Sequence, residues 1–550
     1  MVSFQGFRFK KAVLMAITSN EEELKKMKKK EEEVRSSRVM RVFLTSLAVL
    51  LVLVLLPIAA ADRRAEEAMR GKENIIMATI KKFLGSDNEI EKLSLALLPP
   101  NITLAKVDSM PHESAALAGE VYTTGVASAV VSLRRAMHAN PGIMYDEYFA
   151  SETVVATLRA IGVREENIKT GYGITGVIAH IGAGTLDESL SMKSGMVPTI
   201  ALRADMDALP IHEETDVPFK STVDGVMHAC GHDAHTAMLL GAAMLLKRHE
   251  AAIATMGGAV RLFFQPAEEG GAGAKAMIDQ GALKGATAAA MLHVGSNMNT
   301  GTIIATRGQS HAACYTWHAV IKGVGAHGAA PHMSKDPIAA AGAIISAGNT
   351  IVSRTVKPTD VAVFSVGYVD AGVAFNVIPD EVTMGGTIRL TDVTLWDSFW
   401  DTIVTRITNI AEGYGCTAEV YNRDGDKGVN SRGEEFTIHA FPPNVNDDEM
   451  LDMGINLASR MYGAENTDIL TARRTGCEDF AFLSQEVPGV QFRIGTKHPD
   501  HAPGEKTGTQ GHNPLFDIDE RALPRGSAFL ASLALEYIKE KNLRDGHVEL

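Results

Sequence analysis

Three apolar runs in this sequence each end in side chains that can bind metal ions. The runs Val197–Ala204, Ala259–Phe264 and Ala288–Leu292 are followed by Asp205, by a segment that contains Glu268 and Glu269, and by His293. Short apolar runs bounded by polar residues are typical of buried strands. Because open α/β sheets bind ligands at the carboxyl ends of their strands, these endings predict a site at one edge of a sheet.

A polar cluster before a buried helix adds further ligand types to this site. Thr236–Leu246 is apolar on nearly every side, which predicts a helix inside the protein. Cys230 and His232 stand just before it, so both can approach one centre from a short turn. The adjacent carboxylates of Glu268 and Glu269 repel each other unless a cation compensates, which favours a metal site.

Other chemistries fit this sequence less well. A zinc finger would need a second closely spaced pair of Cys or His ligands, which the sequence lacks. A serine hydrolase would need a G-x-S-x-G elbow, which is also absent from the sequence. A cysteine protease would need Cys230 as a free nucleophile, although metal-type ligands crowd it. His512, in the loop Gly511–Pro514, is a further candidate ligand far along the chain.

Residues 310–421 follow a different pattern, which predicts a second domain inserted into the first. Strands are expected over 314–321, 361–366, 382–390 and 417–421, with helices over 337–351 and 396–411. This β-α-β-β-α-β order is that of the split βαβ fold. The expected fold class is α/β: a mixed-sheet catalytic domain of residues 125–309 and 422–540 with an inserted ferredoxin-like α+β satellite domain. Residues 62–124 are expected to form a helical or loosely ordered lead-in, and residues 541–550 a tail.

The N-terminal residues 1–61 differ in kind from the rest of the chain. Val42–Ala61 is almost wholly apolar, two arginines precede it, and three alanines close it. Read from Met40 as the start, this is the pattern of a cleaved signal peptide. An uncleaved membrane anchor is the alternative, because about 20 apolar residues can span a bilayer.

The last four residues indicate where the protein is located, and its net charge argues against one class of partner. His547-Val548-Glu549-Leu550 resembles the H-D-E-L retrieval signal with Val in place of Asp, so we expect the endoplasmic reticulum lumen. The formal net charge of −13 argues against nucleic acid as the main partner. Four cysteines in 550 residues exclude a disulfide framework. Cys314 and Cys416 fall in different expected strands of the satellite domain, where they could pair in an oxidising lumen or be small buried hydrophobes.

Six motifs together resemble the amidohydrolase branch of the metallo-aminoacylase and carboxypeptidase family, over about Gly125–Lys539. They are Arg203–Pro210, His228–His235, Phe264–Gly270, His327–His332, Phe375–Pro379 and Gly476–Phe480. The signal segment and the tail are most similar to those of plant hydrolases of indole-3-acetic acid–amino acid conjugates. Cys477 departs from the family's pattern, which usually has a small residue there.

The resemblance implies a role for each residue of the site. Cys230 would bridge two divalent metals, with the other ligands supplied by His232, Glu269, His293 and His512. Glu268 would be the general base, and His327 would reach the substrate or the oxyanion. Asn376 and Arg389 would hold the substrate's carboxylate, or else be a loop amide and a surface cation. The resemblance favours Mn²⁺, whereas the soft thiolate ligand favours Zn²⁺, and Co²⁺ is a further candidate.

The implied reaction is hydrolysis of the amide bond between a hydrophobic acyl group and an amino acid. The partner would be a small N-acyl amino acid, bound in a cleft that closes between the two domains. A general aminoacylase or carboxypeptidase of other acyl preference is the nearest alternative, and a catalytically dead binding relative is another. The sequence specifies neither the acyl group nor the oligomeric state.

Overall fold

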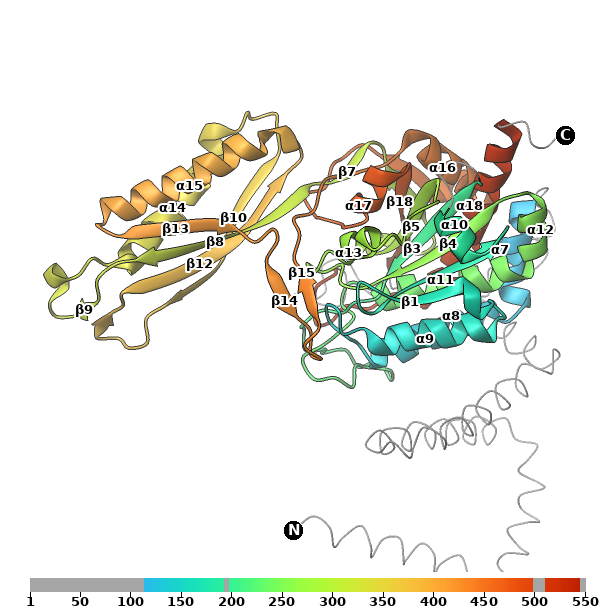
Figure 1. The fold of residues 1–550 in the computed structure, drawn as a ribbon, viewed down its shortest axis with the longest axis horizontal. Coiled ribbons are helices and arrows are strands. Elements are labelled where there is room, and N and C mark those ends of the chain that lie inside the picture. Colours follow the sequence, from blue (N-terminus) through green and yellow to red (C-terminus); the bar gives the residue numbers. More distant parts are fainter. Residues whose placement is uncertain (1–112, 192–196, 498–509, 545–550) are drawn as a thin grey trace, which may run out of the picture. The chain divides into compact units, whose positions relative to one another are not determined.

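The computed structural model describes residues 113–191, 197–497 and 510–544 (Figure 1). The expected signal segment, most of the lead-in and the retrieval-like tail lie outside the described residues. Within the described ranges, no helix is both long enough and apolar enough to cross a membrane.

The catalytic domain is built on one mixed sheet of eight strands, as its sequence predicted. In order across the sheet, these are β1 (Ile168–Tyr172), β2 (Gly176–Gly182), β4 (Ala259–Gln265), β3 (Thr199–Asp205), β5 (Ala288–Asn299), β18 (Gly489–Lys497), β6 (Ile303–Thr306) and β17 (Thr467–Leu470). The central strands β4, β3, β5 and β18 run parallel to one another, whereas β2 and β6 are antiparallel to their neighbours β4 and β18. The carboxyl ends of the three predicted strands therefore meet at one edge.

Helices pack on both faces of this sheet. The main core on one face is covered by α7 (Glu113–Thr123), α8 (Val126–Ala139), α9 (Tyr148–Ala160), α11 (His232–Arg248), α12 (Glu250–Thr255), α16 (Asp448–Tyr462) and α18 (Leu523–Arg544). Two smaller cores on the other face are covered by the shorter helices α10 (Leu186–Ser191), α13 (Gly273–Asp279) and α17 (Ala481–Glu486). Alternate residues of β3 belong to different cores: Leu202 packs in the large cluster with α11 and α18, and Ala201 packs with Phe480 beside α17. Burial on both faces explains why these strands read as continuous apolar runs.

Two boundaries differ from those expected. The side chains of Leu117 and Val121 on α7 are buried in the main core, so the compact domain begins before Gly125. His293 lies inside β5 and not at its end, because the pairing of β5 with β18 continues as far as Asn299. Strand β5 is therefore longer than the apolar run Ala288–Leu292 from which it was predicted.

The inserted domain has the predicted split βαβ order. Its elements are β8 (Ala313–Lys322), α14 (Pro337–Thr355), β10 (Ala362–Ala371), β12 (Glu381–Leu390), α15 (Trp396–Gly413) and β13 (Thr417–Asn422), with the sheet order β10-β12-β8-β13. Asp336 caps α14, since its carboxylate accepts the N–H groups of Ile338 and Ala339. Short strand pairs complete the chain: β7 (Gln309–His311) with β16 (Asn444–Val445), β9 (Ala326–His327) with β11 (Val377–Ile378), and β14 (Lys427–Val429) with β15 (Glu435–Thr437).

Candidate active site

Two predicted metal ligands lie at the start of α11. His232 is the first residue of the helix, and Cys230 lies two residues before it. Gly231, between them, has a φ of 88°, a left-handed conformation that favours glycine. A Cβ at this position would lie 2.5 Å from Cγ2 of Val294. The glycine therefore allows the turn to lie directly against β5, the strand that carries His293.

Asp207 fixes the orientation of the His232 ring. One carboxylate oxygen of Asp207 lies 3.0 Å from Nδ1 of His232, and the other accepts the backbone N–H of Glu269 at 2.8 Å. Nε2 of His232 is buried and has no hydrogen-bond partner in the described part of the chain. Leaving a buried nitrogen unpaired is costly, and an aspartate behind a histidine is the usual support of a metal ligand. Nε2 thus has the environment of an atom that binds metal.

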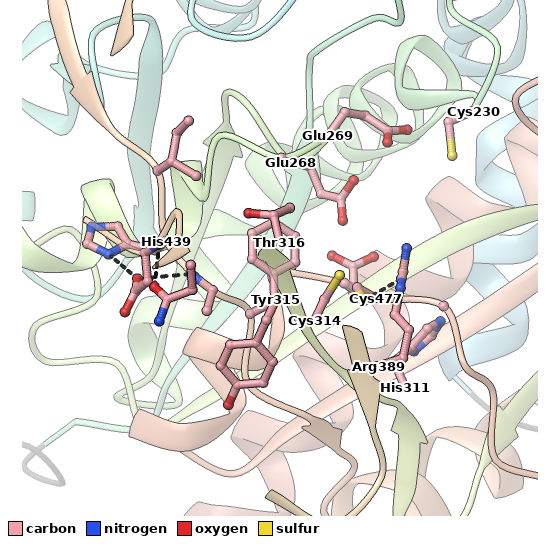
Figure 2. A pocket seen from close by; sticks show the side chains of 18 of the residues that line it. Cys230, Glu268, Glu269, His311, Cys314, Tyr315, Thr316, Arg389, His439 and Cys477 are labelled. Carbon is pink, nitrogen blue, oxygen red and sulfur yellow. Dashed lines mark hydrogen bonds and ion pairs between the residues drawn. The ribbon is translucent and has the colours of Figure 1, made fainter. Parts of the chain in front are cut away.

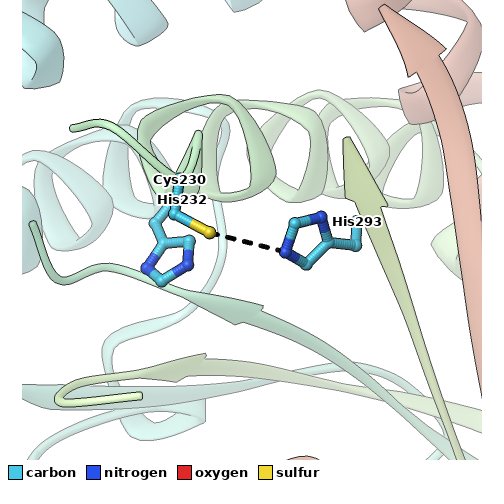
Figure 3. A group of neighbouring side chains, drawn as sticks. All are labelled: Cys230, His232 and His293. Atoms are coloured by element: carbon cyan, nitrogen blue, oxygen red, sulfur yellow. Dashed lines mark hydrogen bonds between the residues drawn. The ribbon is translucent and has the colours of Figure 1, made fainter. Parts of the chain in front are cut away.

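His293 presents its Nε2 atom to the same centre. Its Nδ1 lies 2.6 Å from the backbone oxygen of Val294 and donates to it, which leaves Nε2 as an acceptor. That Nε2 lies 3.7 Å from Sγ of Cys230 (Figure 3). Burial, followed by the charge of His235, lowers the pKa of His293 well below its ordinary value. The neutral imidazole is the form that binds a metal.

His512 closes the cluster from a distant loop. Its Nε2 lies 3.0 Å from Oε1 of Glu269, and its backbone N–H donates to the carbonyl of Ala229 at 2.8 Å. Hydrogen bonds with Cys230 and Glu269 raise the pKa of His512 to about 10. The carboxylate of Glu269 brings negative charge to this point, which a divalent cation would balance.

The ligand atoms form two overlapping groups. Those of Cys230, His232 and His293 lie within 4.8 Å of one another, and so do those of Cys230, Glu269 and His512. Since Cys230 belongs to both groups, the arrangement fits a thiolate that bridges two cations. The donor set of sulfur, imidazole and carboxylate suits divalent transition metals. The fold thus brings the five predicted ligands into one cluster, although they are spread in sequence from residue 230 to residue 512.

Glu268 lies beside this cluster and lines the adjoining cavity (Figure 2). Only 7% of its surface is exposed. Burial and then the charges of Glu478 and Glu269 raise the pKa of Glu268 well above its ordinary value. A buried carboxylate that holds a proton more readily than a free one can both accept and return a proton, which suits a general base.

A buried arginine holds the acids behind the cluster in place. The guanidinium of Arg203 lies 2.8 Å from Asp205, 3.1 Å from Glu478 and 2.7 Å from Asp479. Asp205 in turn lies 2.6 Å from Nδ1 of His235. These roles were not assigned from the sequence, although the alternation of Arg203, Asp205 and Asp207 was a usable signal. Alternate residues at a strand end lie on the same side.

A cavity of about 390 Å³ adjoins the cluster, with residues of both domains in its wall (Figure 2). The catalytic domain contributes Cys230, Glu268, Glu269, His293, Cys477 and His512, and the satellite domain contributes Cys314, Tyr315, Thr316 and Arg389. Nη1 of Arg389 donates to Sγ of Cys477 at 2.6 Å. The structure therefore places Arg389 at the candidate site and not on an open surface.

His327 and Asn376 lie elsewhere. The backbone N–H of Gly328 donates to the carbonyl of Asn376 at 2.8 Å, so these two candidates are neighbours, and both are exposed. Strand β12 pairs with β8 from Arg389 opposite Cys314 to Glu381 opposite Lys322. At about 3.3 Å per residue, this length of strand separates the His327 end of the satellite from Arg389 by roughly 26 Å. Neither residue lines the cavity in the described part of the chain.

The suggested pairing of Cys314 with Cys416 is excluded by the same register. Cys416 precedes Thr417, which lies opposite Lys322, whereas Cys314 is at the other end of β8. Cys416 packs in the satellite core with 3% of its surface exposed, in agreement with the alternative of a small buried hydrophobe.

Comparisons with known proteins agree with this geometry. The family model of peptidase family M20/M25/M40 matches residues 201–536. The chain is 37% identical over 421 residues to IAA-amino acid hydrolase ILR1-like 5 of Arabidopsis thaliana, covering 76% of this chain and 89% of that protein. It is 36% identical over 415 residues to N-acetylcysteine deacetylase of Bacillus subtilis, covering 74% and 98%.

Solved structures share the fold as well. A putative aminohydrolase from methicillin resistant Staphylococcus aureus is 27% identical with a TM-score of 0.62, covering 77% of this chain and 99% of that chain. The YXEP protein of Bacillus subtilis, described as a dinuclear metal binding peptidase from the M20 family, is 32% identical with a TM-score of 0.57, covering 75% and 98%.

Proposed function

Because this chain belongs to peptidase family M20/M25/M40, we propose that it hydrolyses the amide bond of indole-3-acetic acid–amino acid conjugates. The class of chemistry is that of the family: the protein is an amidohydrolase that depends on two divalent metal ions. The overlap of two ligand groups at Cys230, next to the buried Glu268, supports this chemistry most directly. The relatives named as IAA-amino acid hydrolases support the substrate.

Glu268 carries the proton transfers in this proposal. Ions held by Cys230 and its four companion ligands would polarise the amide carbonyl and acidify a water molecule. Glu268 takes the proton of the attacking water and then gives it to the nitrogen of the leaving amino acid. Glu268 lines the cavity, and its pKa is raised. Both properties fit the uptake of the proton from water and its later return to the leaving amine.

Arg389 is proposed to hold the free carboxylate of the substrate. A guanidinium group binds a carboxylate through two parallel hydrogen bonds, and this one already lies in the cavity wall. For His327 and Asn376 we propose contact with the substrate only after the satellite domain closes over the cavity.

Manganese is the proposed resident metal, with zinc as the competitor. The thiolate of Cys230 is a soft ligand that suits Zn²⁺, whereas the carboxylate of Glu269 also suits Mn²⁺. To distinguish these metals, a chelator first removes the bound metal, and Mn²⁺, Zn²⁺ or Co²⁺ is then added one at a time. We expect the resident metal to restore the highest turnover.

A substrate panel tests the proposed function. We expect the reconstituted enzyme to release amino acids from indole-3-acetyl conjugates with a higher kcat/KM than from N-acetyl amino acids. The polar side chains of Asp424 and His439 in the cavity wall favour the second candidate, a deacetylase of N-acetyl amino acids. The reverse order of kcat/KM would establish that second activity. Absence of turnover on every member, with two metals bound, would instead indicate a binding protein.

The endoplasmic reticulum lumen is the proposed location, on the basis of Val42–Ala61 and the final four residues. We expect the mature protein to begin near Asp62 and to remain inside the cell. N-terminal sequencing that finds residues 1–61 attached would favour the membrane anchor. If deletion of residues 547–550 does not change how much of the protein is secreted, the tail is not a retrieval signal.

A further inference from the structure

Two cysteines from different domains meet in the wall of the cavity. Cys314 is the second residue of β8, and Cys477 lies in the loop between β17 and α17. The backbone holds their segments side by side: Arg474 N–H donates to Ser310 at 3.0 Å, and Ala312 N–H donates to Gly476 at 3.1 Å. The closeness of the two cysteines is therefore a property of the backbone and not of one rotamer.

Their side chains are in contact, with an arginine alongside. The thiols of Cys314 and Cys477 hydrogen-bond to each other. Arg389 lies opposite Cys314 in the strand register and donates to Sγ of Cys477 at 2.6 Å (Figure 2). Both cysteines are free thiols, and the hydrolytic mechanism uses neither of them.

We propose that Cys314 and Cys477 form a reversible disulfide, with a low-molecular-weight disulfide such as oxidised glutathione as the oxidant. The thiolate of Cys314 attacks one sulfur of glutathione disulfide and releases one glutathione thiolate. The sulfur of Cys477 loses its proton to solvent and attacks the mixed disulfide, which releases the second glutathione. Two protein thiols are oxidised to one disulfide, and one glutathione disulfide is reduced to two thiols.

The surroundings assign the order of the two steps. The hydrogen bond from Cys477, and then the charge of Arg389, lower the pKa of Cys314 and favour its thiolate as the first nucleophile. The hydrogen bond to Cys314, followed by burial, raises the pKa of Cys477. Once Cys314 is in a mixed disulfide, its negative charge is gone, and Cys477 is free to act as the resolving thiol.

The bond would tie the first strand of the satellite domain to the catalytic loop that carries Glu478. It would also turn the Cys477 sulfur, which accepts the Arg389 hydrogen bond next to the proposed carboxylate site, from a thiol into a disulfide sulfur. The effect on turnover rests on the proposed function, because it assumes that the satellite domain must move over the cavity. Formation of the bond itself does not depend on that function.

Peptide mapping tests the bond directly. Metal-loaded enzyme is equilibrated in glutathione buffers from reducing to oxidising, trapped with an alkylating reagent, and digested without reduction. We expect a peptide pair linked through Cys314 and Cys477 that appears as the buffer becomes oxidising and disappears with dithiothreitol. Full alkylation of both cysteines at the most oxidising ratio would overturn the proposal, as would a link from either one to Cys230.

Variants of single cysteines distinguish the Cys314–Cys477 disulfide from oxidation at other cysteines. Cys416→Ser is the matched control, since Cys416 precedes Thr417, which pairs with Lys322 at the far end of β8 from Cys314. Its linked peptide yield should equal that of the unaltered enzyme. Cys314→Ser removes the first nucleophile, so it should form neither the link nor the mixed disulfide, and its turnover should be insensitive to the oxidising buffer. The unaltered enzyme should lose on the order of tenfold in turnover under the same conditions and recover on reduction. Equal loss in Cys314→Ser would show that another site, such as Cys230, causes the inhibition.

Discussion

The Glu268→Gln variant is expected to turn over roughly 10²–10⁴-fold more slowly than the unaltered enzyme, the usual scale for loss of a general base. Glutamine keeps the size and hydrogen bonding of the side chain but cannot accept a proton. The carboxylate of Glu268 lies within 4.8 Å of the ligand atoms of His232 and Glu269. Because the proposal gives the proton to Glu268 and the metal to Glu269, metal content and substrate binding should persist. Single-turnover rates measured beside metal analysis would check both expectations.

Glu269→Gln is the matched control, since it makes the same chemical change one residue away. Oε1 of Glu269 lies 3.0 Å from Nε2 of His512 and 3.9 Å from Nε2 of His232, among the ligands. This variant should lose metal first, and excess Mn²⁺ should restore part of its activity. If Glu268→Gln is the variant that loses metal, the roles of the two glutamates must be exchanged.

Cys230→Ser is expected to lose both bound metal and activity while keeping the fold. A serine hydroxyl stays protonated at neutral pH and is a far poorer bridging ligand than a thiolate. Because Cys230 is shared by both ligand groups, metal affinity should fall by more than the roughly 10–100-fold typical of losing an outer-shell partner. Metal analysis after dialysis, with circular dichroism as the check on folding, measures this.

Cys416→Ser again supplies a comparison, because Cys416 is a buried thiol of the satellite core and not of the site. It should keep its metals and its turnover. A Cys230→Ser enzyme that retains two metals and normal turnover would make Cys230 a structural residue and the assigned ligand set wrong.

The sequence indicated most of the proposed ligand cluster because a local rule places every one of these ligands except His512. His232 begins a helix, Glu269 follows a strand, and the glycine before His232 allows close packing. Each rule puts a side chain at the edge of the sheet, and the parallel pairing of the strands brings those ends together. His512 had no such local rule: it was a candidate only as an imidazole in a distant loop, and the resemblance to the family then implied its role as a ligand.

Contacts between distant segments could not be predicted in the same way. The ion pair of Arg203 with Asp479 joins β3 to a loop from beyond the inserted domain, and no local pattern specifies that meeting. The neighbouring motifs around His327 and Asn376 suggested roles but not positions. Only the register of β8 with β12 shows that they lie far along the satellite from Arg389. The meeting of Cys314 and Cys477 likewise depends on backbone hydrogen bonds between segments that are distant in sequence.

The position of β18 bears on how the chain is made. This strand lies between β5 and β6, yet it comes from residues 489–497, long after both neighbours have left the ribosome. Until it arrives, β5 presents an open edge of unpaired N–H and C=O groups to other nascent chains. The six satellite elements are consecutive in sequence and can fold during that interval, since domains generally fold as units. A ribosome that stalls before residue 489 would therefore display a finished satellite on an unfinished sheet, whose open edge stays exposed to pairing with other chains until this one central strand is made.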